Sequence, residues 1–323
     1  MKHTVNVVSE NNWLTQYKDK SDMDTFIHQC LCDGAEVLRG GEDTTGIYTP
    51  DNVIGCHLYF SPDFLDFWRQ DIPALLTHFH NKEEYETYYR AKTPEEQMKH
   101  YQDDMDYAEK MGAEYVVMHV NDVSNEEILS YSWLHSNEEV IRGMAELVNC
   151  CTKGKNYHFK LLFENLFTPG MDLLNPKETE LMLSLVDFEN KGILMDTGHL
   201  MCASRVVTNE SEGVDFVLDT VKKHGELAKY IRGLHLHKST TADYIRSYIE
   251  NPKPQAEEDF YDRFNQTYSI ILNIDQHRPF ETSRVKEIIE KVEPDWVCHE
   301  ISARSREEKL EKVLIQMHAL GKI

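Results

Sequence analysis

The chain has 323 residues, of which 34 are basic and 56 are acidic, giving a formal net charge of −22. This acidic balance disfavours a broad contact with nucleic acid or with an anionic membrane surface. The length suits one large barrel or two smaller domains, and no Pro-, Gly- or Ser-rich linker interrupts the chain. We therefore expect a single domain over residues 1–323.

The N-terminal sequence and the pattern of cysteines predict the cellular compartment of the protein. Met1–Val5 leads into no long apolar segment, and the sequence contains no run of about 18 apolar residues that could cross a bilayer. Among the seven cysteines, only Cys30/Cys32 and Cys150/Cys151 are close pairs, and there is no Cys-x-x-Cys motif. We expect a cytoplasmic protein with reduced thiols, most of them small core residues.

Short apolar runs recur along the chain and predict strands. Runs of this length are typical of strands that are buried on both faces of a parallel sheet. In chain order, the predicted strands are Val5–Ser9, Gly34–Leu38, Val53–Tyr59, Tyr115–Val120, Phe159–Glu164, the stretch Gly192–His199, Ile231–His237 and Trp296–Glu300.

Segments with helical spacing of apolar residues separate these strands. The second segment is interrupted at Thr93-Pro94, where Thr93 can cap a new helix that begins with proline. The predicted helical segments are Asp24–Cys32, Asn81–Met111, Asn137–Cys151, Pro176–Val186, Glu212–Tyr230, Ser283–Lys291 and Ser305–Leu320.

Two further stretches are unusual. The connection after Lys238 runs for roughly 45 residues, and connections of this length are often functional, so we expect a lid or substrate loop. It contains an acidic helical segment near Ala256–Leu272 and the sequence Asp275-Gln276-His277. The stretch Phe60–Arg69 is rich in aromatic residues and either packs under a lid or lines a pocket.

Strands that alternate with helices about eight times over this length indicate a (β/α)8 barrel with an extended loop after the seventh strand. The alternative, a doubly wound open sheet, would more often begin with a Gly-rich phosphate loop, and the sequence has none. In a barrel, the C-terminal ends of all strands meet at one mouth, where the chemistry is placed.

Several predicted strands end in a histidine or an acid. In Gly192–His199, the apolar run stops at Asp196 and His199 follows three residues later, so we expect a tight turn in which Gly198 permits the backbone conformation that points both side chains at one spot. The full set of candidate metal ligands is His57, His119, Glu164, Asp196, His199, His235, Asp275, His277 and Glu300.

This set predicts a metal centre. Burying several acids together is costly unless cations neutralise them. Mixed imidazole and carboxylate ligation suits zinc first, and also manganese, iron or cobalt, better than calcium or magnesium. Because the ligands are too many for one ion, we expect two or three divalent ions per chain. Glu164, Glu300 and His199 are the candidate catalytic residues.

Each residue also has a plainer interpretation. A lone histidine near a strand end, such as His57 or His119, is more often a hydrogen-bonded core residue than a ligand, and an acid such as Glu164 can cap a helix. Side chains alternate along a strand, so His235 and His237 share one face, and His237 replaces His235 as the ligand if the register differs. His237, Lys238 and His299 are otherwise expected to play supporting or structural roles.

These residues carry a resemblance that spans nearly the whole chain. The motifs are Glu164-Asn165, Asp196-Thr197-Gly198-His199, Leu234-His235-Leu236-His237, Asp275-Gln276-His277 and Glu300. They resemble the xylose isomerase-like TIM barrel superfamily, also called AP endonuclease family 2, with its sugar phosphate isomerase/epimerase and endonuclease IV branches.

The resemblance implies two different sites. Glu164, Asp196, His235 and Glu300 resemble the metal set of the sugar isomerases and epimerases. The fuller set, which adds His57, His119, His199, Asp275 and His277, resembles the three-zinc site of the endonuclease IV branch. His237 and Lys238 stand where that branch usually shows Asn-Asp, and the strand-seven connection is longer, which speaks against DNA as the substrate.

The first functional hypothesis is a polynuclear metal hydrolase that acts on a phosphoester or phosphoribosyl-type bond of a small molecule, because a metal cluster activates water and stabilises the entering and leaving oxygens. Glu164 would bridge two ions and orient the attacking water. The alternative is a metal-dependent sugar or sugar-phosphate isomerase/epimerase in which Glu164 and Glu300 form an acid/base pair.

Three weaker alternatives follow from the resemblance and from the fold. An abasic-site endonuclease conflicts with the acidic chain, because phosphate contacts come mainly from Lys and Arg. A hydrolase that remodels corrinoid cofactors rests on analogy of fold alone. A barrel that only binds a ligand would not need so complete a set of acids and histidines. We expect a small-molecule partner and neither nucleic acid nor membrane.

Overall fold

The computed structural model describes residues 1–41, 43, 45–252 and 259–323. Eight parallel strands pair in sequence order and close into a barrel, as predicted. They are β1 (Lys2–Val8), β2 (Gly34–Leu38), β3 (Val53–His57), β4 (Tyr115–His119), β5 (Lys160–Glu164), β6 (Lys191–Asp196), β7 (Ile231–His235) and β8 (Trp296–His299).

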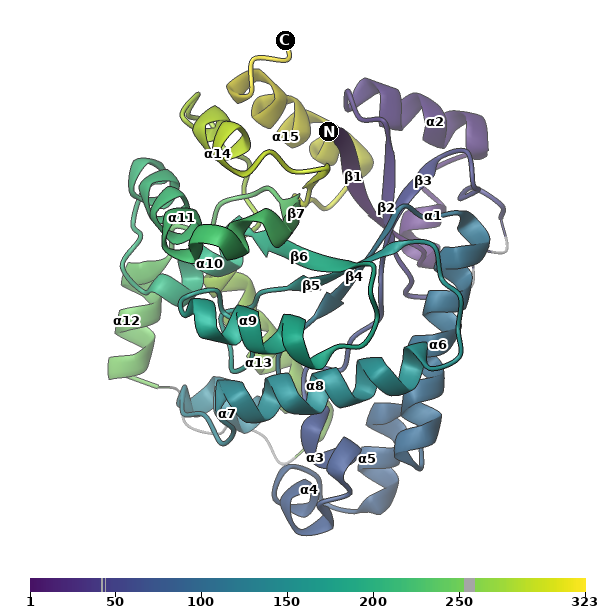
Figure 1. The fold of residues 1–323 in the computed structure, drawn as a ribbon, viewed down its shortest axis with the longest axis vertical. Coiled ribbons are helices and arrows are strands. Elements are labelled where there is room, and N and C mark those ends of the chain that lie inside the picture. Colours follow the sequence, from purple (N-terminus) through teal and green to yellow (C-terminus); the bar gives the residue numbers. More distant parts are fainter. Residues whose placement is uncertain (42, 44, 253–258) are drawn as a thin grey trace.

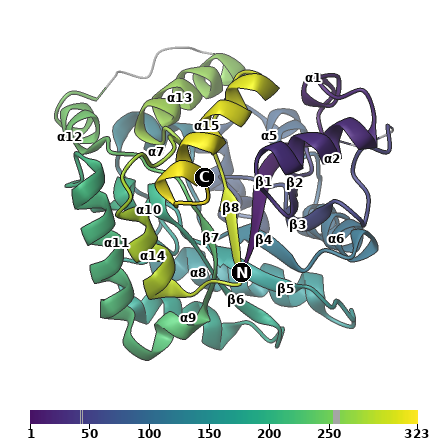
Figure 2. The same ribbon diagram turned by 90° about the horizontal axis from the view of Figure 1, so that it is seen from above.

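The barrel closes between its first and last strands. Lys2 of β1 lies opposite Trp296 of β8, and Val5 lies opposite His299. Figure 2 shows these two strands side by side, with the N-terminus at the edge where they meet. All strands run in the same direction, so their C-terminal ends form one common mouth.

Helices surround the strands on the outside (Figure 1). They are α1 (Asn11–Leu14), α2 (Lys20–Gln29), α3 (Leu65–Arg69), α4 (Ile72–His78), α5 (Lys82–Tyr89), α6 (Pro94–Met111), α7 (Asn125–Ser130), α8 (Asn137–Thr152), α9 (Pro176–Leu185), α10 (Thr197–Ser204), α11 (Glu210–His224), η1 (Gly225–Tyr230, a 3-10 helix), α12 (Ala242–Glu250), α13 (Phe260–Ile274), α14 (Val285–Val292) and α15 (Arg306–Ala319).

Local sequence explains where these helices begin. The predicted interruption at Thr93 separates α5 from α6, and the Thr93 side chain accepts a hydrogen bond from the backbone N–H of Glu96. At the start of α8, Ser136 and Glu139 form a reciprocal capping box. Apolar side chains on the inner face of α8 then pack with those of the strands in the main core.

Some elements end earlier than predicted. The seventh strand ends at His235 rather than His237, and the eighth ends at His299 rather than Glu300, because the pairing of β7 with β8 ends at His235 and that of β8 with β1 ends at His299. The helix expected over Glu212–Tyr230 is divided at Gly225, whose φ of +54° cannot continue an α-helix.

The long connection after β7 is built from helices. Part of its predicted acidic segment, residues 256–258, lies outside the described residues, and the remainder forms α13. Buried side chains of α12 and α13, including Ile245, Tyr248 and Ile270, pack in one cluster with Ile128 of α7. The connection is therefore anchored by an apolar cluster that is separate from the main core and that it shares with α7 and α10.

No helix within the described part of the chain is both long enough and apolar enough to span a bilayer. Six of the seven cysteines are buried, which agrees with their predicted role as small core residues.

Candidate metal centre

All of the predicted ligands lie together at the mouth of the barrel. Three groups consist only of predicted ligands and have potential ligand atoms within 4.8 Å of one another, and a further such group joins His277 and Glu300 to His237. Group 1 is His57, His119 and Glu164; group 2 is Glu164, Asp196, His235 and Glu300; group 3 is His199, Asp275 and His277.

Glu164, the last residue of β5, joins the groups. Its Oε2 atom lies 3.2 Å from Nε2 of His57 and 3.3 Å from Nε2 of His119. Its Oε1 atom lies 3.2 Å from Nδ1 of His235 and 3.3 Å from Nδ1 of His199. The side chain is completely buried, so one carboxylate is shared between opposite sides of the mouth without contact with solvent.

The two histidines of group 1 come from the ends of adjacent strands, β3 and β4. Their Nε2 atoms lie 3.1 Å apart. The Nδ1–H of His57 donates to the carbonyl oxygen of Leu58 at 2.8 Å, which in the neutral ring leaves a lone pair on Nε2. The ring of Phe60 lies 4.2 Å from that of His119, so the aromatic stretch lines the site here, whereas Phe64 packs in the core.

Group 3 is held by the end of α13. Asp275 is the C-terminal cap of that helix, and its Oδ2 lies 3.1 Å from Nε2 of His199 and 2.5 Å from Nε2 of His277. The hydroxyl of Ser239 donates to Oδ1 of Asp275 at 2.9 Å. The Nδ1–H of His199 donates to the carbonyl oxygen of Asn165 at 3.0 Å, which leaves its Nε2 turned toward Asp275. The long connection thus supplies two members of the site.

The turn predicted around Asp196 is in fact the start of a helix. Asp196 caps α10, since its Oδ1 accepts a hydrogen bond from the backbone N–H of His199 at 2.6 Å. Gly198 lies inside this helix and does not supply an unusual backbone conformation, contrary to the prediction. A Cβ atom at Gly198 would lie 2.0 Å from Cε1 of His237. The glycine is therefore needed to make room for that ring.

Group 2 surrounds Nδ1 of His235. This nitrogen lies 2.9 Å from Oε2 of Glu300, 3.2 Å from Oε1 of Glu164 and 3.7 Å from Oδ2 of Asp196. One nitrogen can offer only one hydrogen to these three carboxylates. Oε2 of Glu300 is buried and, apart from this ion-pair contact with His235, has no hydrogen-bond partner among the described residues. A divalent cation at this point would satisfy the oxygens that a single proton cannot.

The electrostatics lead to the same conclusion. Burial alone would raise the pKa of Glu164, but His235 and His119 outweigh it and hold that pKa well below its usual range. Burial alone would lower the pKa of His235, but the carboxylates of Glu300, Glu36 and Glu164 hold it well above its ordinary value. In the protein without metal, protons on the histidines thus balance the charge of the acids. Metal ions would displace these protons on binding.

The three residues assigned to supporting roles differ in their positions. Nε2 of His237 lies 2.7 Å from Oδ2 of Asp196, and its ring stacks on His277 with centroids 4.0 Å apart, so His237 borders the site from the side of α10. Lys238 forms ion pairs with Glu210 and Glu281. His299 lies on the outer side of β8, beside Gln316 of α15.

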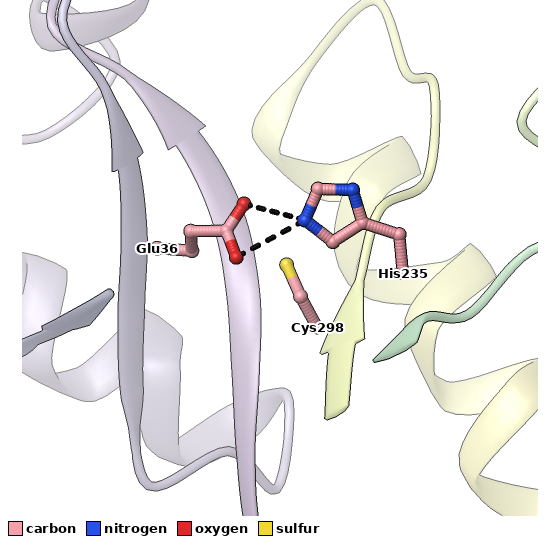
Figure 3. Close-up of side chains that lie close together, drawn as sticks. All are labelled: Glu36, His235 and Cys298. Atoms are coloured by element: carbon pink, nitrogen blue, oxygen red, sulfur yellow. Dashed lines mark hydrogen bonds and ion pairs between the residues drawn. The ribbon is translucent and has the colours of Figure 1, made fainter. Parts of the chain in front are cut away.

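One acid of the site was not predicted, Glu36 in the middle of β2. Its carboxylate lies against Nε2 of His235, and Cys298 stands next to both (Figure 3). The signal in the sequence was an acid within the short apolar strand Gly34–Leu38, where a buried carboxylate is unfavourable unless it has a partner. Glu36 does not end a strand, so it was absent from the predicted ligands, which were chosen at strand ends.

Solved structures share this architecture across the whole chain. A D-tagatose 3-epimerase-like protein is 16% identical with a TM-score of 0.54, covering 100% of this chain and 98% of its own. Endonuclease IV from Thermus thermophilus is 12% identical with a TM-score of 0.53, and both chains are covered to 100%. The IolI protein, solved with a bound zinc atom, is 12% identical with a TM-score of 0.53, covering 100% of this chain and 99% of its own.

At such low identity these similarities show the fold alone. A search of curated protein sequences gives no match. The family model of the xylose isomerase-like TIM barrel matches residues 86–317, which is more than half of the chain. The match includes eight of the nine predicted ligands, all except His57. The chain therefore belongs to the xylose isomerase-like TIM barrel family.

Proposed function

We propose that this protein is a polynuclear metal hydrolase that cleaves a phosphoester or phosphoribosyl-type bond of a small molecule. The observation that carries the proposal is the division of Glu164 between groups 1 and 2, with Oε2 facing His57 and His119 and Oε1 facing His235. Oε1 also lies 3.3 Å from Nδ1 of His199 in group 3. A carboxylate placed in this way is suited to bridge two ions. An enzyme with a single ion would have no use for groups 1 and 3.

The donor atoms fit zinc. Groups 1 and 3 each combine two imidazoles with one carboxylate, and group 2 combines one imidazole with three carboxylates. Three protein ligands leave a coordination position for water or substrate, as in catalytic zinc sites. Manganese, iron or cobalt would also accept these donors. Two or three bound ions would acidify water and neutralise the charge that develops on the phosphoryl oxygens.

Side chains of this chain would then hold the reacting groups. Glu164 would fix the spacing of the ions, and a lone pair of its carboxylate that binds no ion would accept a hydrogen bond from the attacking water. The Nδ1–H of His199 is held by the carbonyl oxygen of Asn165, which fixes the direction of its Nε2. Phe60 would exclude water beside His119, since its ring covers that imidazole. Glu300 would act from group 2, where its Oε2 lies 2.9 Å from Nδ1 of His235.

The charge of the chain supports a small substrate. A protein of net charge −22 repels a long polyanion, and contacts to a nucleic-acid backbone depend on Lys and Arg. A single phosphate group can be neutralised by the ions themselves. We therefore propose a small phosphorylated molecule, with abasic DNA as the control substrate that should not be cleaved.

The test is a panel of substrates. The metal-loaded protein is incubated with phosphate monoesters, phosphate diesters and phosphoribosyl compounds, and released phosphate or alcohol is measured before and after treatment with a chelator. We expect metal-dependent hydrolysis of at least one class. Absence of hydrolysis across all three classes, by protein that holds its full complement of ions, would refute the proposal.

A second candidate is a sugar or sugar-phosphate isomerase/epimerase. Group 2 favours it, because this group is a complete site for one ion and places Glu164 and Glu300 on the same nitrogen of His235. Such an enzyme exchanges a proton beside the carbonyl of its substrate. Incubation with ketoses and ketose phosphates in deuterated water distinguishes the two functions, since deuterium at that carbon favours the isomerase and its absence favours the hydrolase.

A further inference from the structure

A series of buried hydrogen bonds leads from His235 into the interior of the barrel. Nε2 of His235 lies 3.0 Å from Oε1 and 3.2 Å from Oε2 of Glu36. The hydroxyl of Tyr115 donates to Oε2 of Glu36 at 2.7 Å, and the hydroxyl of Thr4 lies 3.0 Å from that of Tyr115. Figure 3 shows the carboxylate of Glu36 pointing across the barrel at the His235 ring.

The barrel is shaped to hold this series. Glu36, Tyr115 and His235 are each at most 2% exposed, so the carboxylate is removed from water and depends on its protein partners. A Cβ atom at Gly55 of β3 would lie 2.3 Å from Cζ of Tyr115. The glycine therefore leaves the space in which the tyrosine ring crosses toward Glu36. The space and the two contacts together hold the carboxylate of Glu36 in place between Tyr115 and His235.

Glu36 decides which nitrogen of His235 carries hydrogen. An ionised carboxylate only accepts hydrogen bonds, so Nε2 of His235 must be the donor. In the neutral ring, the lone pair then lies on Nδ1, which faces Glu164, Asp196 and Glu300 in group 2. A lone pair among three carboxylates is unfavourable, except where a cation lies between them.

We propose that Glu36, held in place by Tyr115, is a positioning residue that fixes the Nε2–H tautomer and the orientation of His235, so that Nδ1 is presented to a divalent ion in group 2. The inference rests on the proposed function, because it assigns a ligand role to His235. Outer carboxylates of this kind typically contribute a factor of about 10–100 to the metal affinity of a histidine ligand.

A competing interpretation places a separate ion in the cluster of Glu36, His235 and Cys298. The potential ligand atoms of these three residues also lie within 4.8 Å of one another. Both oxygens of Glu36 are, however, at hydrogen-bond distance from Nε2, and Tyr115 already donates to the same carboxylate. The contacts are those of a carboxylate satisfied by protons. Cys298 then has no part in the function, and it provides a matched control.

The experiment compares Glu36→Gln, Tyr115→Phe and Cys298→Ser with the unmodified chain. Zinc stoichiometry and affinity are measured by competition with a chromophoric chelator. The 15N resonances of His235 are recorded by NMR in the metal-free protein, at a pH high enough to leave the ring neutral. We expect Glu36→Gln to lower the affinity for one zinc ion by about 10–100-fold and to remove the preference of His235 for the Nε2–H tautomer. Tyr115→Phe should act in the same direction but more weakly, and Cys298→Ser should leave both readouts unchanged.

Two results would overturn the inference. The first is a Glu36→Gln variant with unchanged zinc affinity and an unchanged tautomer. The second is a Cys298→Ser variant that loses a zinc ion, since this would assign the cluster to a metal of its own. If Glu36→Gln does not fold, as judged by circular dichroism, Tyr115→Phe carries the same test. An unmodified chain that binds no zinc refutes the proposed function instead, and the NMR measurement then decides alone whether Glu36 sets the tautomer.

Discussion

Two pairs of histidines in this protein have ring nitrogens at similar distances but have different surroundings. At the mouth, the Nε2 atoms of His57 and His119 lie 3.1 Å apart and face Glu164. Between β1 and β8, Nδ1 of His3 lies 3.0 Å from Nε2 of His299. Among the described residues, no carboxylate lies at hydrogen-bond distance from either ring of the second pair: Asp33 accepts from the backbone N–H of His3, and the His299 ring contacts the amide of Gln316.

The difference shows what makes a buried histidine available for chemistry. Burial lowers the pKa of His299 to about 3 and that of His3 to about 4, so both rings are neutral structural groups. At the mouth, burial acts in the same direction, but the carboxylate of Glu164 outweighs it at His57 and raises the pKa of that residue. At His119 burial prevails and the pKa is lowered, so what the two rings share is the buried carboxylate that both face. A histidine near a strand end thus becomes a candidate ligand only where an acid is buried with it.

The largest expected effect comes from removing that acid. Glu164→Gln keeps the shape of the side chain but takes a charged ligand from two groups at once. We expect the loss of at least one bound ion. Hydrolysis should fall by more than the roughly 100-fold that is typical when a residue hydrogen-bonded to a metal ligand is replaced. Metal analysis and turnover measure the effect. His299→Gln is the control, and equal losses in both variants would contradict the contrast between the two pairs.

A smaller effect should follow from changing one histidine of the mouth pair. His119→Asn removes an imidazole from group 1 and leaves group 2 intact. If hydrolysis requires more than one ion, activity should fall by on the order of 10²-fold with the loss of one ion per chain. A single-ion isomerase would keep its activity in this variant. Full activity with one ion fewer would therefore refute the polynuclear hydrolase.

The smallest expected effect is on the stability of the fold and comes from the pair His3 and His299. The pKa values of about 4 for His3 and about 3 for His299 lie below the ordinary value of 6.5. At pH values between these pKa values and 6.5, the unfolded chain therefore binds more protons than the folded chain. The contribution of the two neutral rings to stability is present above pH 6.5 and is lost as the pH falls toward 4.

Chemical denaturation of the metal-free protein at about pH 7 and about pH 5 measures this loss. We expect the free energy of unfolding to fall less for His299→Gln than for the unmodified chain, by on the order of 1 kcal/mol. Glu164 is unchanged in this variant, so its metal content should also be unchanged. An identical decrease in both proteins would show that the pair is not neutral when folded.

Much of the site was accessible from the sequence because barrel topology turns strand ends into neighbours. His57, His119, Glu164 and Asp196 each end a short apolar run, and such runs are easily recognised. Glu36 was missed because it lies in the middle of its strand, and only the closed barrel brings it across to His235. Closure of the barrel brings together interior side chains of strands that are distant in sequence, and a local sequence pattern does not predict such contacts.

The helices were less predictable where tertiary packing decides them. Thr93 and Pro94 mark the start of α6 in the sequence itself. In contrast, α12 was not predicted, and its buried face is completed by α7 and α13. Gly198 is a similar case, since its requirement comes from the ring of His237, which is distant in sequence.

The most direct test of the central claim is anomalous diffraction from crystals of the protein purified without added metal and then soaked in zinc, with data collected on both sides of the zinc absorption edge. The account predicts ions within coordination distance of groups 1, 2 and 3, with Glu164 touching two of them. A single ion in group 2, with the other groups joined by hydrogen bonds alone, would contradict it.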